Sequence, residues 1–194
     1  MKDKPMKIII LSEDVAGHGH RKAAEALVDG IRTIQLKSEV SIYNIFPLVS
    51  RTLEICTSIV YRQIVSKIPS VWGWIYEREK SESISKAFKK LLTYSVAVKL
   101  VPFLHEQKPD VIVCTHAFSL GALAHLKGKG FSFQLGVAIT DMDVNSFWIY
   151  DAIDFYIVGN EQMKDKIIKF YGVKESRIHV TGIPIHGRFG NVLE

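Results

Sequence analysis

Cysteine is scarce in this chain, since only Cys56 and Cys114 occur among its 194 residues. Two cysteines so far apart form neither a disulfide framework nor a CxxC metal pair, and we interpret both as buried thiols. Long hydrophobic runs are missing too: runs such as 8–11 and 135–139 fall far below the roughly 20 residues that cross a bilayer. The apolar run after the charged N-terminus is also too short for a signal peptide, which needs about 7 to 15 residues. We therefore expect a cytoplasmic protein.

Positive charge exceeds negative charge by +5, and the excess is confined to one stretch. Residues 62–108 hold nine Lys or Arg against four Glu, and the rest of the chain sums to zero. Tryptophan favours the bilayer interface, and lysine is attracted to anionic headgroups. Because aromatic and basic residues alternate here, we predict a membrane-facing region at about 59–106. Its predicted contacts with anionic lipids are Trp72, Trp74, Lys86, Lys89 and Lys90. The alternative is a solvated helix whose aromatic residues belong to the core, and no nucleic-acid recognition motif is present.

Predicted strands and helices alternate along the chain, which is typical of an α/β domain with a mostly parallel sheet flanked by helices. The predicted strands are 7–12, 39–45, 110–114, 134–140, 155–158 and 178–180. The predicted helices are one with apolar spacing from Ala23 to Ile34, then 48–66, 83–105, 118–126 and 161–170. We expect Pro47 to mark a break after the second strand. We also expect that the chain stops at a domain boundary without a closing helix.

The segments that follow the strands are the candidates for chemistry, because ligands of open α/β sheets bind beyond the carboxyl ends of the strands. Gly17-His18-Gly19-His20 lies between the first strand and the first helix. Lys22 stands where a dinucleotide fingerprint needs glycine, and the Gly-Lys-Ser/Thr of a P-loop is absent. Glycines at a helix N-terminus suit a diphosphate. His20 is placed to accept a proton from a hydroxyl, although a simple turn with a capping histidine is the alternative.

Two later segments are less specific. His116 follows the strand 110–114, where it can line a cleft, cap the next helix or point to solvent. Asp141 and Asp143 have the Asp-x-Asp spacing of a metal site, but no further ligand has helpful spacing nearby. Zinc held by His18, His20 and His116 lacks a supporting cysteine or acidic pattern. We therefore predict no metal site.

Four blocks of sequence in this order resemble one known family. The blocks are IIILSEDVAGHGHRKAAEA (8–26), KPDVIVCTH (108–116), TDMDVNSFW (140–148) and VTGIPIHGRF (180–189). Together they look like the diacylglycerol glucosyltransferase and monogalactosyldiacylglycerol synthase family. That family is related more distantly to the peptidoglycan lipid-intermediate N-acetylglucosaminyltransferase.

The resemblance implies a GT-B architecture, in which two Rossmann-like domains face a cleft. Residues 1–194 would be the acceptor-binding N-terminal domain, without the C-terminal domain that binds UDP-glucose or UDP-galactose. The substrate acceptor would be diacylglycerol at the inner membrane leaflet, with no cofactor. By match to the family motifs, His20 would be the catalytic base and Gly17 and Gly19 would lie near the donor diphosphate. The acceptor or lipid would contact His116, Asp141, Asn145 and Trp148.

The sequence departs from the family pattern at two of these blocks. Asn145 stands where the family usually has histidine, and His186 stands where it usually has arginine. Two other interpretations stay open: a non-catalytic lipid-binding remnant of such an enzyme, and half of a peptidoglycan lipid-intermediate transferase. The second is less well matched, because this chain lacks the extra glycine pair that the loop of the peptidoglycan transferase usually carries.

Overall fold

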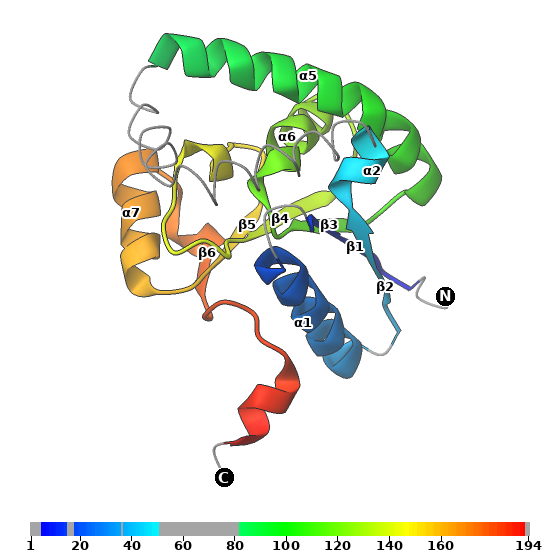
Figure 1. The fold of residues 1–194 in the computed structure, drawn as a ribbon, viewed down its shortest axis with the longest axis vertical. Helices are drawn as coiled ribbons and strands as arrows, with labels where there is room; N and C mark the ends of the chain where they lie inside the picture. Colours follow the sequence, from blue (N-terminus) through cyan, green and yellow to red (C-terminus); the bar gives the residue numbers. More distant parts are fainter. Residues whose placement is uncertain (1–4, 15–17, 36, 51–81, 193–194) are drawn as a thin grey trace, which may run out of the picture.

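A single six-stranded sheet forms the centre of the molecule, and all of its strand pairs are parallel. The computed structural model describes residues 5–14, 18–35, 37–50 and 82–192. The strand order is β2-β1-β3-β4-β5-β6 (Figure 1). The strands are β1 (Lys7–Ser12), β2 (Glu39–Asn44), β3 (Val111–Cys114), β4 (Gln134–Ala138), β5 (Phe155–Val158) and β6 (Ile178–Val180). The predicted Rossmann-like α/β fold with a mostly parallel sheet is confirmed.

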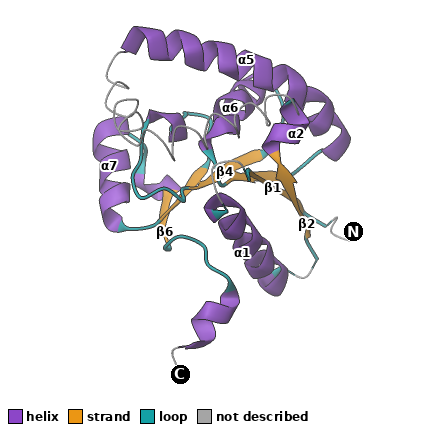
Figure 2. Ribbon diagram, in the orientation of Figure 1, coloured by secondary structure: helices purple, strands orange, loops and turns teal. Residues whose placement is uncertain are grey.

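Helices separate the strands along the chain (Figure 2). The α-helices are α1 (Gly19–Ile34), α2 (Ile45–Val49), α5 (Glu82–Gln107), α6 (Leu120–Gly128) and α7 (Glu161–Tyr171). Short 3₁₀ helices are η1 (Ala117–Ser119), η2 (Ser146–Trp148), η3 (Glu175–Arg177) and η4 (Gly187–Val192). Among the described helices, none has the length and hydropathy that a membrane span requires.

Both faces of the sheet are buried, which explains why its central strands are continuous apolar runs. On one face, Ala24 and Val28 of α1 pack against Ile8 and Ile10. The other face is larger: Ile9 and its neighbours in the sheet pack under α2, α5, α6 and α7. Figure 1 shows α1 on one side of the sheet, together with the C-terminal η4, and α5 with α6 on the opposite side. Successive residues of β1 point to opposite faces of the sheet, so they contribute alternately to the two hydrophobic cores.

Two predictions about the elements are corrected by the structure. Pro47 does not break the chain but lies in the first turn of α2, which begins earlier than expected, at Ile45. Proline is tolerated there because the first N–H groups of a helix have no intrahelical partner, and the Asn44 side chain accepts a hydrogen bond from the Phe46 N–H at 3.1 Å. A closing 3₁₀ helix, η4, is present although none was expected.

Several predicted features lie outside the described residues. Trp72, Trp74, Cys56 and most of the predicted helix 48–66 belong to the undescribed stretch 51–81. Lys86, Lys89 and Lys90 lie within α5, but their side chains are not described. The membrane-facing region therefore stays a prediction.

Candidate functional site

Polar side chains from separate loops meet at the carboxyl edge of the sheet. Glu13 follows β1, Thr115 and His116 follow β3, Thr140 follows β4, and His20 lies in the first turn of α1. The strand β1 lies between β2 and β3, so the chain order reverses at this point of the sheet. Such a reversal is where open α/β sheets bind their ligands. The fold thus brings the predicted residues His20 and His116 to the expected place.

His20 is held in one orientation by two oxygen atoms. Its Nδ1 lies 2.9 Å from the carbonyl oxygen of Thr115 and 2.5 Å from Oγ1 of Thr140. A carbonyl oxygen only accepts, so Nδ1 must carry the proton. The Thr140 hydroxyl in turn donates to the Thr115 carbonyl at 3.2 Å. The neutral His20 ring therefore presents an unprotonated Nε2, the form that a general base requires.

His116 has the opposite arrangement. Its Nδ1 accepts a hydrogen bond from the Phe118 N–H at 3.3 Å, which caps η1. The neutral ring must then carry its proton on Nε2. Burial, with a smaller effect of the nearby His20, lowers the pKa of His116 to about 3. The two rings meet edge to face with centroids 4.8 Å apart, so a proton donor and a proton acceptor lie side by side.

Glu13 completes this group, and the sequence did not single it out. Its side chain is only 1% exposed, and its Oε1 lies 3.7 Å from Nε2 of His20 and 3.9 Å from Nε2 of His116. Buried acidic side chains are rare in proteins unless they interact with a partner or serve a function. The available signal was an acidic residue directly after a buried strand, the position where ligands bind.

The same three side chains are the candidates for a metal site within the part of the chain that the structure describes. The possible ligand atoms of Glu13, His20 and His116 all lie within 4.8 Å of one another. Zinc, at about 2.0 to 2.2 Å from each ligand, needs ligand atoms roughly 3.4 Å apart, and the separations of 3.7 and 3.9 Å between Glu13 and the two histidines are longer. His116 would also have to move its proton from Nε2 and lose the hydrogen bond to Phe118. The residues therefore fit a metal poorly as they stand.

The two aspartates of the Asp-x-Asp segment are engaged elsewhere. Asp141 accepts a hydrogen bond from Nε1 of Trp148 at 3.0 Å. Asp143 pairs with Lys166 at 2.6 Å, and this hydrogen bond is the main cause that lowers the pKa of the Asp143 carboxyl. The segment folds as a structural loop.

The loop that carries these aspartates contacts His116 through Trp148. Trp148 is only 1% exposed, and its ring centroid lies 6.5 Å from that of His116. The Asn145 side chain accepts from the Phe147 N–H at 3.0 Å and caps η2. Trp148 thus shapes the site from the protein interior. Asn145 holds the turn before it.

The glycine loop is described only in part. Gly17 lies outside the described residues, whereas Gly19 is the first residue of α1. A Cβ atom at Gly19 would meet no atom of the described residues within 4 Å. The backbone at this helix N-terminus is therefore open to an approaching ligand, and helix N-termini favour anions.

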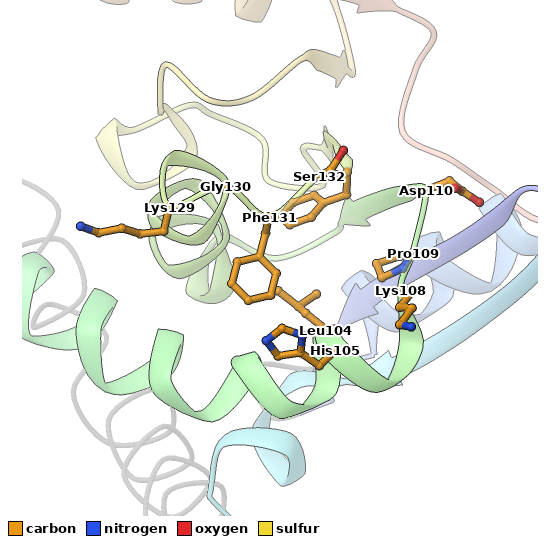
Figure 3. A pocket seen from close by; sticks show the side chains of 10 residues that line it. Leu104, His105, Lys108, Pro109, Asp110, Lys129, Gly130, Phe131 and Ser132 are labelled. Atoms are coloured by element: carbon orange, nitrogen blue, oxygen red, sulfur yellow. The ribbon is translucent and has the colours of Figure 1, made fainter.

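A surface cavity of about 570 Å³ lies at the other end of the strands (Figure 3). His105 and Phe131, whose ring centroids lie 5.1 Å apart, line it together with Asp110, which precedes β3. His20 follows the carboxyl end of the sheet, so this cavity does not belong to the site of the two histidines.

Residues 20–185 of the chain match the family described as monogalactosyldiacylglycerol (MGDG) synthase. An uncharacterized glycosyltransferase, YkoN, of Bacillus subtilis (strain 168) is 28% identical over 173 residues, covering 88% of this chain and 45% of that protein. A processive diacylglycerol beta-glucosyltransferase of Bacillus pumilus (strain SAFR-032) is 25% identical over 200 residues, covering 94% of this chain and 46% of that protein. The chain thus spans about half the length of these curated relatives.

A solved structure shares the fold. The apo form of the lipopolysaccharide outer core galactosyltransferase WaaB superposes with a TM-score of 0.50 at 14% identity. The match covers 90% of this chain and 45% of that one. At this identity the likeness shows the fold alone, a Rossmann-like α/β architecture.

Proposed function

Because this chain belongs to the monogalactosyldiacylglycerol synthase family, we propose that it is the acceptor-binding domain of a hexosyltransferase of glycolipid synthesis. The acceptor is diacylglycerol, and the donor is UDP-glucose or UDP-galactose. One observation supports the proposal: Nδ1 of His20, the residue that matches the family's histidine, lies 2.9 Å from the carbonyl oxygen of Thr115. A carbonyl oxygen only accepts, so this contact leaves the lone pair of the neutral ring on Nε2.

In this reaction the lipid hydroxyl oxygen attacks the anomeric carbon of the sugar. The bond from that carbon to the diphosphate oxygen breaks, and UDP leaves with the electron pair. His20 accepts the hydroxyl proton on Nε2 as the new bond forms. The hydrogen bonds from Nδ1 to Thr115 and Thr140 hold the ring while this happens.

The donor is proposed to bind mainly to a second domain. The curated relatives are about twice as long as this chain, and a transferase must position both reactants to reach a useful rate. Gly17 and Gly19 are the proposed contribution of this chain to the donor, because the open N-terminus of α1 can approach a diphosphate. No resident metal or cofactor is part of this proposal.

The acceptor side is proposed to be formed by His116 and the loop behind it. In this loop, Asp141 accepts a hydrogen bond from the Trp148 side chain, and the Asn145 side chain accepts one from the Phe147 N–H. We propose that they set the position of His116 relative to the lipid headgroup.

We also propose that the domain works as a peripheral protein on the cytoplasmic face of the membrane. Trp72, Trp74, Lys86, Lys89 and Lys90 are the proposed contacts. The support is the +5 balance of residues 62–108 and the lipid named as the substrate of relatives such as the Bacillus pumilus diacylglycerol beta-glucosyltransferase.

The test is sugar transfer from radiolabelled UDP-glucose and UDP-galactose to diacylglycerol in anionic vesicles. The chain is assayed alone and after addition of the C-terminal half of a curated relative. We expect transfer only after the addition. Vesicle binding without transfer in both cases would favour the non-catalytic lipid-binding protein, and transfer to polyprenyl-linked sugar instead would favour the peptidoglycan enzyme.

His20 is tested in the same assay. We expect His20→Ala to lower turnover by about 100-fold or more while vesicle binding is kept. The matched control is His179→Ala, which removes an exposed histidine of β6. Unchanged turnover of the His20 variant would remove this residue from the role of base.

A further inference from the structure

The polar atoms of Glu13, His20 and His116 lie close together. Oε1 of Glu13 lies 3.7 Å from Nε2 of His20 and 3.9 Å from Nε2 of His116, and one possible ligand atom of each side chain lies within 4.8 Å of the others. Two atoms that far apart can both lie about 2.8 Å from one oxygen atom, a normal hydrogen-bond distance. The two imidazole rings can therefore share one hydroxyl oxygen, with Glu13 beside them.

The three side chains offer different chemistry to such an oxygen. His116 presents an N–H, because its Nδ1 is used by the Phe118 N–H. His20 presents a lone pair, because its Nδ1 proton is used by Thr115 and Thr140. A hydroxyl group is both acceptor and donor, so it can accept from His116 and donate to His20 at the same time.

We propose that Glu13, His20 and His116 form one site for the acceptor hydroxyl, in which His116 holds the oxygen, His20 takes the proton and Glu13 stabilises the charge that results. This inference rests on the proposed function and assigns roles to two further residues. His116 and His20 touch the reacting group and are catalytic residues. Glu13 acts through His20 and is a positioning residue.

The role of Glu13 follows from its distance and its burial. At 3.7 Å its carboxylate is too far from Nε2 of His20 for a short hydrogen bond, but close enough for a strong charge interaction where water is excluded. When the hydroxyl proton moves to His20, the ring becomes an imidazolium beside this carboxylate. A charge placed in advance where new charge develops lowers the barrier without reorganisation.

The step balances with the donor of the proposed function. The bond between the acceptor oxygen and the anomeric carbon forms, and the bond between that carbon and the diphosphate oxygen breaks. The electron pair leaves with UDP, and the proton rests on Nε2 of His20 until solvent removes it. His116 keeps its own proton throughout, because it only donates a hydrogen bond.

The first experiment measures the tautomers of the two rings in the full chain. Long-range ¹H–¹⁵N NMR spectra at pH 7.5 distinguish a ring protonated on Nδ1 from one protonated on Nε2. We expect the Nδ1–H form for His20 and the Nε2–H form for His116, assigned with His20→Asn and His116→Asn variants. His116 protonated on Nδ1, or a shift of both rings on addition of one equivalent of zinc, would overturn the proposal.

The second experiment separates the roles by kinetics, with the chain combined with the donor half. We expect Glu13→Gln to lower kcat by about 10-fold or more, with the KM for diacylglycerol within twofold, and Glu13→Asp to recover part of the loss. His116→Gln, which keeps an N–H donor, should retain more kcat than His116→Leu. The matched control is Glu25→Gln, which removes a carboxylate of α1 that pairs with Arg21 and Lys22.

The outcomes distinguish this inference from the proposed function. A Glu13→Gln variant with unchanged kcat contradicts the role of Glu13, and a loss as complete as that of His20→Ala would make Glu13 the base instead. If the unmutated chain combined with the donor half transfers no sugar, the proposed function fails. The tautomer measurement needs no transfer, so reversed tautomers overturn the hydroxyl site even in an active protein.

Discussion

At the scale of single residues, the direction of a few hydrogen bonds separates two histidines that look alike in the sequence. His20 donates from Nδ1 to a carbonyl, whereas His116 accepts at Nδ1 from an amide. Their Nε2 atoms consequently differ in protonation although the rings are in contact. The location of a histidine in a segment that follows a strand is thus enough to suggest a function. Only the hydrogen bonds of the surrounding backbone determine which nitrogen carries the proton.

The partly buried imidazole of His116 predicts a loss of stability in acid. The pKa of His116 falls from 6.5 to about 3 on folding, so below pH 6.5 the unfolded chain binds a proton that the folded chain excludes. The contribution of the neutral His116 to the free energy of unfolding is therefore complete above pH 6.5 and is lost as the pH falls toward 3. Between pH 7 and pH 5 we expect His116 to account for a decrease of about 1 to 2 kcal/mol in the free energy of unfolding, measured by urea denaturation.

The variant His116→Asn isolates this contribution. Asparagine does not titrate, and its side-chain oxygen can still cap the 3₁₀ helix η1 at the Phe118 N–H. We expect the variant to lose less stability than the original chain between the two pH values. Equal losses would show that the ring of His116 is not shielded from protonation.

Glu13 marks the limit of what single residues reveal before the fold is known. His20 and His116 were predicted because glycines and strand ends flank them. Glu13 stands in a polar segment, and its burial depends on the way α1 and the loop after β3 close over it. An acidic side chain near a turn is most often solvated, so the sequence favoured the wrong interpretation at this position.

At the scale of elements, the continuous apolar runs were the most predictive feature. β1 begins and ends as expected, because a strand buried on both faces leaves little doubt about its extent. β5 and the edge strand β6 also have the expected bounds. Pro47 was misinterpreted because proline acts as a breaker only beyond the first turn of a helix. The capping Asn44 was the signal that could have corrected it.

The cap of α7 gives a prediction at this scale. The side chain of Asn160 accepts a hydrogen bond from the Met163 N–H at 2.9 Å. We expect Asn160→Ala to destabilise the protein by about 1 kcal/mol, because that N–H loses its partner. Thermal or urea denaturation measures the change. Asn160→Asp keeps an acceptor and should stay close to the original stability; a matching loss in both variants would argue against the cap.

At the scale of the whole molecule, the uneven charge predicts how the domain meets a membrane. We expect the combined change of Lys86, Lys89 and Lys90 to glutamine to weaken binding to anionic vesicles roughly 10- to 100-fold, since each lysine near such a surface contributes about 1 kcal/mol. The effect should be larger at low salt. Sedimentation with vesicles of defined anionic content measures it.

A control with the same change in net charge tests whether position matters. Lys37, Lys129 and Lys174 are exposed and lie outside the basic stretch. Their change to glutamine should alter vesicle binding much less. Equal weakening by both triple variants would mean that overall charge, and not a membrane-facing region, governs the binding.

The position of His20 also links the site to the folding of the domain. Its two hydrogen bonds connect it with residues 95 and 120 positions away along the chain. Contacts of such long range form only after large loops have closed, which is entropically costly and slow. A partly folded chain in which β4 has not yet joined β3 lacks Thr140 beside His20. Correct orientation of this one imidazole therefore reports that the centre of the sheet has been assembled in full.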